Sequence, residues 1–322
     1  MRFSSTAVRL FLTVAVSAAL LSSARGQAAN QAEAARETSR VRGPSPFQTG
    51  VGPGEQAVVA GELPQRQEYG ELKVLYNARP LPTFSLQAFS GAFYTSNAAL
   101  LPPSREIGDW YFQQGVALNW SKGIFQSTLF PHASFYQSWF EYARPGVTGI
   151  GNFSAMDVDV GVTYALRKLA NIAVSVDYVY ERLADLGLDN EIFHENHLVL
   201  GLNKVFFVSR TQSAFVQAFG DISLQTAPLV SERNEYGAGI GYAIDWIPEV
   251  TTTFSYRYAR YDYTAGPRQD NNHSFAVSLV WRVRPWIFLQ LGGNYILNNS
   301  NFRIFNYHVF TGGPSAAVNI QW

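Results

Sequence analysis

Residues 234–246, with the sequence NEYGAGIGYAIDW, decide the fold class because two kinds of side chain alternate along them. Every second position from Tyr236 gives Tyr, Ala, Ile, Tyr, Ile and Trp, while the intervening positions give Glu, Gly, Gly, Gly, Ala and Asp. Successive side chains of a strand point to opposite faces, so this stretch predicts a strand with one apolar face and one small, polar face. The apolar face begins with Tyr and ends with Trp, as expected where aromatic residues lie at the two interfaces of a membrane.

Three other segments repeat this pattern, at residues 109–120, 153–166 and 171–181. In each of them one face is mainly apolar, and the other is rich in Gly, Ala, Ser, Asn, Gln and Asp. Such a polar face would pack poorly in the core of a β-sandwich but suits a wet lumen. The alternation predicts twelve strands, at residues 83–94, 109–120, 124–142, 153–166, 170–182, 193–206, 211–225, 234–247, 250–263, 272–283, 286–297 and 314–322.

The connections between these strands alternate between short and long. The short ones are residues 121–123, 167–169, 207–210, 248–249 and 284–285, and the long ones are residues 95–108, 143–152, 183–192, 226–233, 264–271 and 298–313. A barrel with tight turns at one end and longer loops at the other predicts this asymmetry. We therefore expect an all-β protein, a transmembrane up-and-down antiparallel β-barrel of about twelve strands over residues 83–322.

Composition excludes several other classes of protein. Lys plus Arg and Asp plus Glu are both 24, so the chain lacks the basic excess expected of a nucleic-acid partner. There is no cysteine, which excludes disulfide scaffolds and cysteine-ligated metal sites. Beyond the N-terminus no apolar run approaches the ~18 residues of a membrane-spanning helix.

Two segments precede the predicted barrel. Residues 1–26 combine Arg2 and Arg9, an apolar run over residues 10–21 and a small-residue site at 24–26, which predicts a signal peptide. Residues 27–82 are poor in aromatic residues and rich in Gly, Pro, Gln, Ala and Glu. We expect this segment to be a flexible periplasmic leader or a plug docked in the barrel, because it has too little apolar surface to form a core of its own.

The C-terminus carries a resemblance to a known class. The chain ends AAVNIQW, with Val318, Ile320 and Trp322 on one strand face. This resembles the C-terminal signal of bacterial outer-membrane β-barrel proteins, most of which end in Phe, and the overall layout resembles the porin-like barrels of Gram-negative envelopes. The resemblance implies a place in the bacterial outer membrane, contact with its lipid and with the barrel-assembly machinery, and passage of small solutes.

Sequence patterns typical of enzymes give little support for catalysis. His132 and Ser134 share a strand face, as in some outer-membrane lipid hydrolases, but they fall on the predicted lumen face and lack that family's surrounding motif. His194 and His197 would diverge on a strand, so we expect no metal site there. Gly237, Gly239 and Gly241 lie within a strand and are no dinucleotide fingerprint, so no cofactor is expected.

The predicted lumen face carries a charge pattern. The residues expected to line a pore are Asp157, Asp159, Asp177, Asp221, Asp245, Arg257 and Arg282, and further lumen acids are Glu181, Glu195 and Glu235. The excess of acids predicts a modest preference for cations. Gly237, Gly239 and Gly241 leave room for Arg257 to lie along the wall, where it could pair with acids of the neighbouring strand or face those across the lumen.

These observations favour a porin-like outer-membrane channel for passive diffusion of small hydrophilic solutes or ions. Abundant Gly, Ala and Ser on the lumen face leave volume for a pore. Four aromatic residues on the same face could close it, at Tyr111, Phe215, Phe219 and Tyr261. A non-conducting structural or adhesion barrel is therefore the alternative, and a barrel lipid hydrolase is a weaker one.

Overall fold

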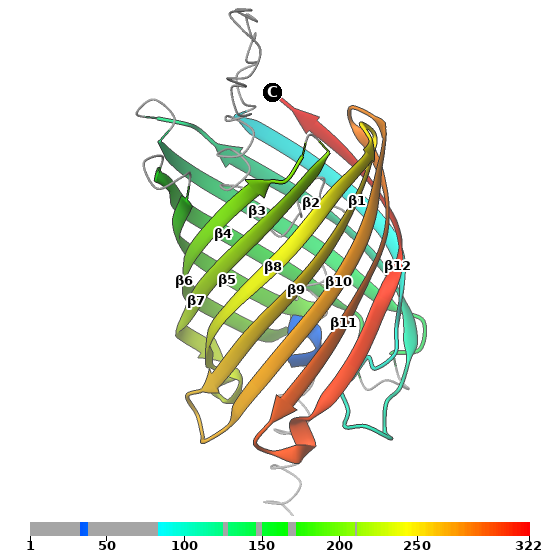
Figure 1. The fold of residues 1–322 in the computed structure, drawn as a ribbon. Helices are drawn as coiled ribbons and strands as arrows, with labels where there is room; N and C mark the ends of the chain where they lie inside the picture. The colour runs from blue at the N-terminus through cyan, green and yellow to red at the C-terminus, as the bar shows by residue number, and fades with distance from the viewer. Residues whose placement is uncertain (1–32, 38–82, 125–127, 146–149, 167–171, 210) are drawn as a thin grey trace, which may run out of the picture.

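A computed structural model describes residues 33–37, 83–124, 128–145, 150–166, 172–209 and 211–322. Twelve antiparallel strands form a closed barrel in which each strand pairs with its neighbours in sequence (Figure 1). The strands are β1 (Phe84–Thr95), β2 (Asp109–Ser121), β3 (Leu129–Tyr142), β4 (Phe153–Leu166), β5 (Ile172–Asp185), β6 (Glu191–Phe207), β7 (Gln212–Ala227), β8 (Arg233–Ile247), β9 (Val250–Tyr263), β10 (Gln269–Arg284), β11 (Ile287–Ser300) and β12 (Tyr307–Gln321). The predicted fold class is confirmed.

Closure depends on pairing between the first and last strands. Ser85 of β1 lies opposite Gln321 of β12, and the ladder runs to Gly91 opposite Ser315 and resumes with Tyr94 opposite Gly312. Because every strand then has two partners, the barrel has no exposed edge. Among the described residues, no helix has the length and apolar character needed to cross a membrane.

The barrel has two distinct ends. The end that carries the chain terminus and the connections after β2, β4, β6, β8 and β10 is called the turn end, and the opposite end is called the loop end (Figure 1). Several strands extend further toward the loop end than expected, since β6 begins at Glu191, β10 at Gln269 and β12 at Tyr307. Most loop-end connections are therefore shorter than predicted, because the hydrogen-bonded ladder continues into the predicted loops. The contrast between the two ends remains, as between residues 96–108 at the loop end and residues 248–249 at the turn end.

The last strand shows the largest difference from expectation, beginning at Tyr307 instead of residue 314. Pro314, the predicted first residue of this strand, lies inside β12 opposite Leu291. The pairing of β12 with β1 is interrupted at this point, which accommodates a residue without a backbone N–H donor. A side chain at Gly313 would meet the carbonyl oxygen of Ala92 at 2.0 Å, so glycine is required for the close approach of the two strands.

The third strand begins later than expected. Ile124 and Leu129 form an isolated bridge, and β3 starts at Leu129. The predicted signal peptide, most of residues 27–82 and the predicted turn at 167–169 lie outside the described residues.

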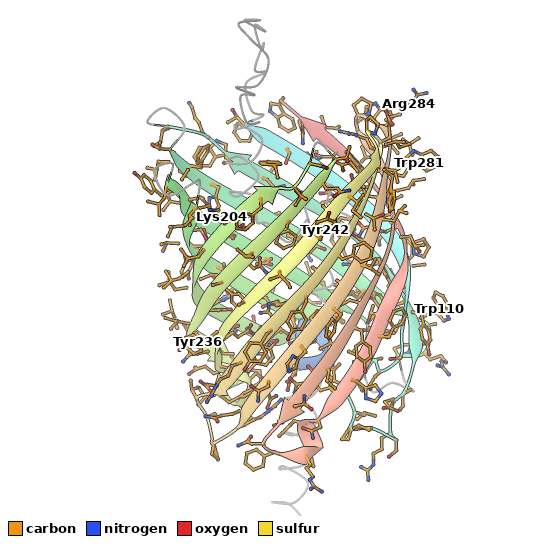
Figure 2. The ribbon with its side chains drawn as sticks, in the orientation of Figure 1. Trp110, Lys204, Tyr236, Tyr242, Trp281 and Arg284 are labelled. Carbon is orange, nitrogen blue, oxygen red and sulfur yellow. The ribbon has the colours of Figure 1, made fainter. Side chains whose placement is uncertain are left out.

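The outer face of the barrel is apolar, as the period-two pattern predicts. Val160, Ile240 and Leu291 are among the residues with more than half of their surface exposed, on β4, β8 and β11. Figure 2 shows Trp281 and Arg284 at the turn end and Tyr236 nearer the loop end. Aromatic residues near both ends with aliphatic residues between them match the outward surface of a transmembrane barrel.

Candidate functional site in the barrel interior

The interior of the barrel holds a polar cavity of about 480 Å³. Its acidic lining residues are Glu37, Asp159, Asp177, Asp221 and Glu235, and its basic ones are His132 and Arg257. An adjoining cavity of about 230 Å³ is lined by Asp157, Glu181 and His197, among others. Both cavities therefore have acidic walls, which attract cations where low-dielectric surroundings focus the field.

Four of the predicted pore residues contribute to these cavities. Asp157, Asp159, Asp177 and Asp221 come from β4, β5 and β7, and all four lie on the inner faces of their strands. Their place follows from the alternation, because the intervening residues such as Val160 face outward.

Two other predicted pore residues, Asp245 and Arg282, do not line these cavities. Asp245 and Arg282 are exposed at the rim of the turn end, away from the cavities. Asp245 Oδ1 accepts a hydrogen bond from the Thr251 hydroxyl at 2.6 Å, and Arg282 donates to the carbonyl oxygen of Pro248 at 2.6 Å. Both residues therefore hold the turns between strands, because β8 and β10 end close to them.

Arg257 pairs across the boundary between β8 and β9. Its guanidinium donates to Glu235 at 3.1 Å and lies 4.4 Å from the centre of the Phe219 ring. Pairing with the neighbouring strand, one of the two arrangements expected, is what the structure has.

The glycines of β8 leave room for side chains other than the expected Arg257. A Cβ at Gly237 would lie 2.4 Å from the Phe219 ring, and one at Gly241 would lie 2.1 Å from the Phe215 ring. The two phenyl rings of β7, instead of Arg257, thus lie against the glycine positions. Phe215 and Phe219 cover the wall closely, because no side chain of β8 holds them away from it.

His132 is fully engaged by its own surroundings. Its Nδ1 lies 3.2 Å from the carbonyl oxygen of Phe130 and its Nε2 lies 2.9 Å from Oδ1 of Asp177. Asp159 lies 3.7 Å from the same Nε2. Since each ring nitrogen faces an oxygen acceptor, the ring is not placed to deprotonate Ser134.

Two groups of side chains inside the barrel could hold a metal ion. One consists of His132, Asp159 and Asp177, and the other of Glu181, Glu195 and His197; within each group, ligand atoms lie within 4.8 Å of one another. Sequence reasoning missed both groups because their members come from different strands, which only the register brings together.

The histidine pair considered from the sequence does not converge. His194 is partly exposed and lies 2.5 Å from Glu191, whereas His197 is buried and lies 2.6 Å from Asp221. The expectation that the two rings point to opposite faces of β6 is confirmed, and His194 belongs to neither group of possible metal ligands.

A short helical segment lies inside the loop end of the barrel. Residues 33–37, drawn in blue in Figure 1, are helical, and Ala34, Ala35, Arg36 and Glu37 are each at most 5% exposed. No feature of the sequence EAARE identified this location. The segment belongs to the predicted leader, whose interpretation as a plug remains a prediction because residues 38–82 are not described.

The segment is held by ion pairs at both of its ends. Glu33 accepts hydrogen bonds from Arg268 at 2.8 and 3.0 Å and from the Tyr263 hydroxyl at 2.9 Å, and Glu37 accepts one from Arg233 at 2.9 Å. Burial disfavours the charge of Arg268, but the neighbouring carboxylates of Glu33 and Asp270 raise its pKa above the ordinary value. These contacts join the segment to β8, β9 and the connection after β9.

Arg36 lies among carboxylates that adjoin this basic group, because Glu235 contacts both Arg36 and Arg233. The Arg36 guanidinium pairs with Glu195, lies 3.6 Å from Glu181 and 3.8 Å from Glu235, and stacks 5.2 Å from the centre of the Phe193 ring. The three carboxylates come from β5, β6 and β8, so one side chain links three strands.

Aromatic residues complete the packing at the loop end. Tyr111 contacts Phe93, Phe140 and Tyr142, with ring centres 5.3–6.0 Å apart, and Phe140 stacks on Phe153 at 4.5 Å. Ala34 and Ala35 pack into the same cluster. Tyr111 was expected as a lumen residue that could close a pore, and it lies in this closed region.

The terminal residues form the seam of the barrel at the turn end. Val318 and Ile320 are exposed on the outer face, and Trp322 is 60% exposed. The backbone N–H of Trp322 donates to the Phe84 carbonyl at 3.1 Å, and the two rings stack with centres 6.0 Å apart. All three terminal residues thus share the outer face, as the sequence predicted.

Similar solved structures are β-barrels of the bacterial outer membrane. An outer membrane channel from Pseudomonas putida F1 aligns with 79% of this chain and 100% of its own, at a TM-score of 0.51 and 12% identity. The NanC porin aligns with 72% of this chain and 98% of its own, at 0.40 and 12%. Outer membrane phospholipase A from Escherichia coli aligns with 72% and 95%, at 0.43 and 12%. At these identities the likeness concerns the fold alone. No protein-family model and no curated protein sequence matches the chain.

Proposed function

We propose that this protein is a porin-like channel of the bacterial outer membrane that passes small hydrophilic solutes and prefers cations. The observation that carries the proposal is the acidic cavity inside a closed barrel with an apolar outer face. Barrels of about eight strands are filled by side chains and those of about sixteen leave an aqueous channel, so twelve strands fit a narrow pore.

Cation preference follows from the charges along the cavity. Asp157 and Asp159 face the interior from one strand, and Asp177 and Asp221 lie close by. In a narrow lumen these carboxylates act on a passing ion through low-dielectric walls. The preference should weaken as salt concentration rises, because mobile ions screen the fixed charges.

The test is the reversal potential under a KCl gradient in a planar bilayer. We expect cation selectivity in the wild type and a smaller reversal potential in the Asp157→Asn/Asp159→Asn double variant. Asp189→Asn is the matched control, because Asp189 is exposed in a connection at the loop end. Anion selectivity in the wild type, or an unchanged potential in the double variant, would contradict the proposal.

A non-conducting structural barrel is the second candidate, and the packed loop end is the observation that favours it. Residues 33–37 and the aromatic cluster around Tyr111 occupy this end of the lumen. Absence of conductance in the wild type and also in a variant with the contacts of Arg36 removed would favour this candidate.

We do not extend the proposal to lipid hydrolysis. Ser134 lies on the inner face, where it lines the smaller cavity, and both nitrogens of His132 face other acceptors. A barrel enzyme acting on lipid would need its nucleophile and base in contact with each other.

The C-terminus supports a proposal about assembly. Val318, Ile320 and Trp322 form a continuous outward stripe at the seam between β12 and β1. We propose that the barrel-assembly machinery reads this stripe, and that outer-membrane lipid covers it in the mature barrel.

A further inference from the structure

Residues 33–37 place charges of both signs in two adjoining sites of opposite charge in the loop end of the lumen. Arg36 lies among Glu181, Glu195 and Glu235, whereas Glu33 and Glu37 lie against Arg233 and Arg268. We call Glu181, Glu195 and Glu235 the acidic seat, and we call Arg233 and Arg268 the basic seat.

The acidic seat is built to hold a planar cation. Glu195 and Glu235 are each 1% exposed, and Glu195 also accepts a hydrogen bond from Thr226 at 3.1 Å, which holds its carboxylate in position. Phe193 supplies a ring face 5.2 Å from the guanidinium carbon of Arg36. Buried carboxylates together with an aromatic face suit a guanidinium, which pairs with carboxylates and stacks on rings.

The basic seat is built to hold a carboxylate. Arg233 is 1% exposed, and the Tyr263 hydroxyl donates to the same carboxylate of Glu33 that Arg268 binds. Arg268 reaches Glu33 with two nitrogens, at 2.8 and 3.0 Å. A forked arginine with a neighbouring hydroxyl recognises a carboxylate by geometry as well as by charge.

We propose that residues 33–37 are a displaceable plug that occupies a binding site for zwitterionic solutes carrying a guanidinium or amine and a carboxylate. Arg36 takes the place of the solute's cation and the two plug glutamates take the place of its carboxylate. A basic amino acid, or a short peptide that contains one, has both groups and competes with the plug. The inference rests on the proposed channel function, because the bound solute is one that the channel passes.

Competition between the plug and a solute follows from the burial of both seats. When the plug leaves, Arg233 keeps Glu235 and Arg268 keeps Asp270, but each loses a carboxylate of the plug, and the acidic seat loses Arg36. Weakening buried ion pairs is costly, so a solute whose charges restore them competes with the plug. A solute with only a cation does not replace the plug carboxylates that Arg233 and Arg268 lose, so it displaces the plug less well. L-arginine and agmatine, which lacks the carboxylate of arginine, therefore distinguish the two-seat site from simple cation binding.

The experiment measures exposure of the plug in the full chain reconstituted in vesicles. Ala35 is fully buried and the chain has no cysteine, so Ala35→Cys supplies one reporter thiol for a water-soluble maleimide. Ala34→Cys provides a second reporter position in the plug. Ala317→Cys, buried in the turn half of the lumen, is the control for general opening of the barrel.

We expect millimolar L-arginine to raise the labelling rate at both plug positions by about tenfold, equivalent to about 1.4 kcal/mol. Agmatine should raise it less, and the rate at Ala317→Cys should not change. Arg36→Gln should raise the rate without any ligand, whereas Arg303→Gln, an exposed arginine at the same end, should not.

Three results would overturn the inference. They are equal acceleration by arginine, agmatine and NaCl at matched ionic strength, no acceleration by arginine, and no effect of Arg36→Gln on the basal rate. Conductance of the same variants is measured separately. Arginine-dependent labelling in a barrel that never conducts would refute the channel function and leave the binding site standing.

Discussion

The two halves of the barrel interior are built on different principles. At the loop end, large side chains and buried ion pairs fill the lumen, and residues 33–37 join opposite walls. At the turn end the interior has smaller clusters, such as Phe130 with Ala165 and Ala173, and the charged rim residues are exposed. The barrel is therefore held at one end by packing across the lumen and at the other by backbone pairing around the wall.

Because of this difference, we expect different regions of the barrel to determine its stability and the passage of solutes. The loop end has the buried charges whose removal is costly, while the middle of the lumen has the acidic cavity that a solute would cross. Substitutions at the loop end should therefore change both folding and access, whereas those at the rim of the turn end should change little beyond local turns.

The largest expected effect concerns closure at the turn end. Deleting Trp322 removes the backbone contacts with Phe84 and the stacked ring, so we expect an unassembled periplasmic species instead of a barrel. The measurement is the amount of heat-modifiable barrel at the cell surface. Trp286→Ala, an exposed tryptophan at the same end, is the control. Normal surface levels after the deletion would show that terminal pairing is dispensable.

The next effect tests packing across the lumen at the loop end. Arg233→Ala removes a buried guanidinium that pairs with both Glu37 and Glu235, and we expect the free energy of unfolding to fall by about 3–5 kcal/mol. Arg282→Ala removes one hydrogen bond at the exposed turn end and should cost about 1 kcal/mol. Urea titration of the refolded barrel measures both, and equal losses would remove the contrast between the two ends.

A third substitution tests the inner and outer faces on which the comparison depends. Val160→Arg places a charge on the lipid side of β4, where we expect a loss of about 2–4 kcal/mol. Asp159→Asn, on the inner side, should have little effect on folding. The same refolding titration in lipid vesicles measures both variants, and similar losses would mean that the faces are wrongly assigned.

The smallest effect concerns the wall between the two ends. Gly241→Ala brings a methyl group to 2.1 Å from the Phe215 ring, which must move, and we expect a loss of about 1–3 kcal/mol. At Gly220 the nearest atom is 3.7 Å away, so Gly220→Ala is the matched control. An unchanged urea midpoint for Gly241→Ala would mean that the ring is free to leave the wall.

The sequence predicts the fold well wherever a local pattern carries the information. Alternation along residues 153–166 places Asp159 inside and Val160 outside, because a strand turns successive side chains to opposite faces. The end of a strand is harder to predict, because it depends on how far the neighbouring strand continues. Pro314 marks a turn by its local preference, yet the pairing of Tyr307 with Asn298 extends β12 beyond it.

The candidate site was predicted only in part, because some of its residues are brought together by contacts between distant parts of the chain. The acids at 157, 159, 177 and 221 follow from alternation within single strands. The ion pairs of residues 33–37 join them to residues more than 140 positions away, such as Arg36 to Glu195. The short sequence EAARE has no periodicity that could reveal such partners, and the same holds for the seats that it occupies.

The phenyl rings that lie against the glycines of β8 have a consequence for the width of the bore. Phe215 and Phe219 are bulky side chains on the inner wall. Because they lie against Gly241 and Gly237, they project less into the lumen. The width of the lumen at this level thus depends on the absence of side chains at Gly237 and Gly241 as well as on the number of strands. A methyl group added at Gly241, where its nearest neighbours are atoms of the Phe215 ring, should push that ring toward the lumen and narrow the bore without altering any charge.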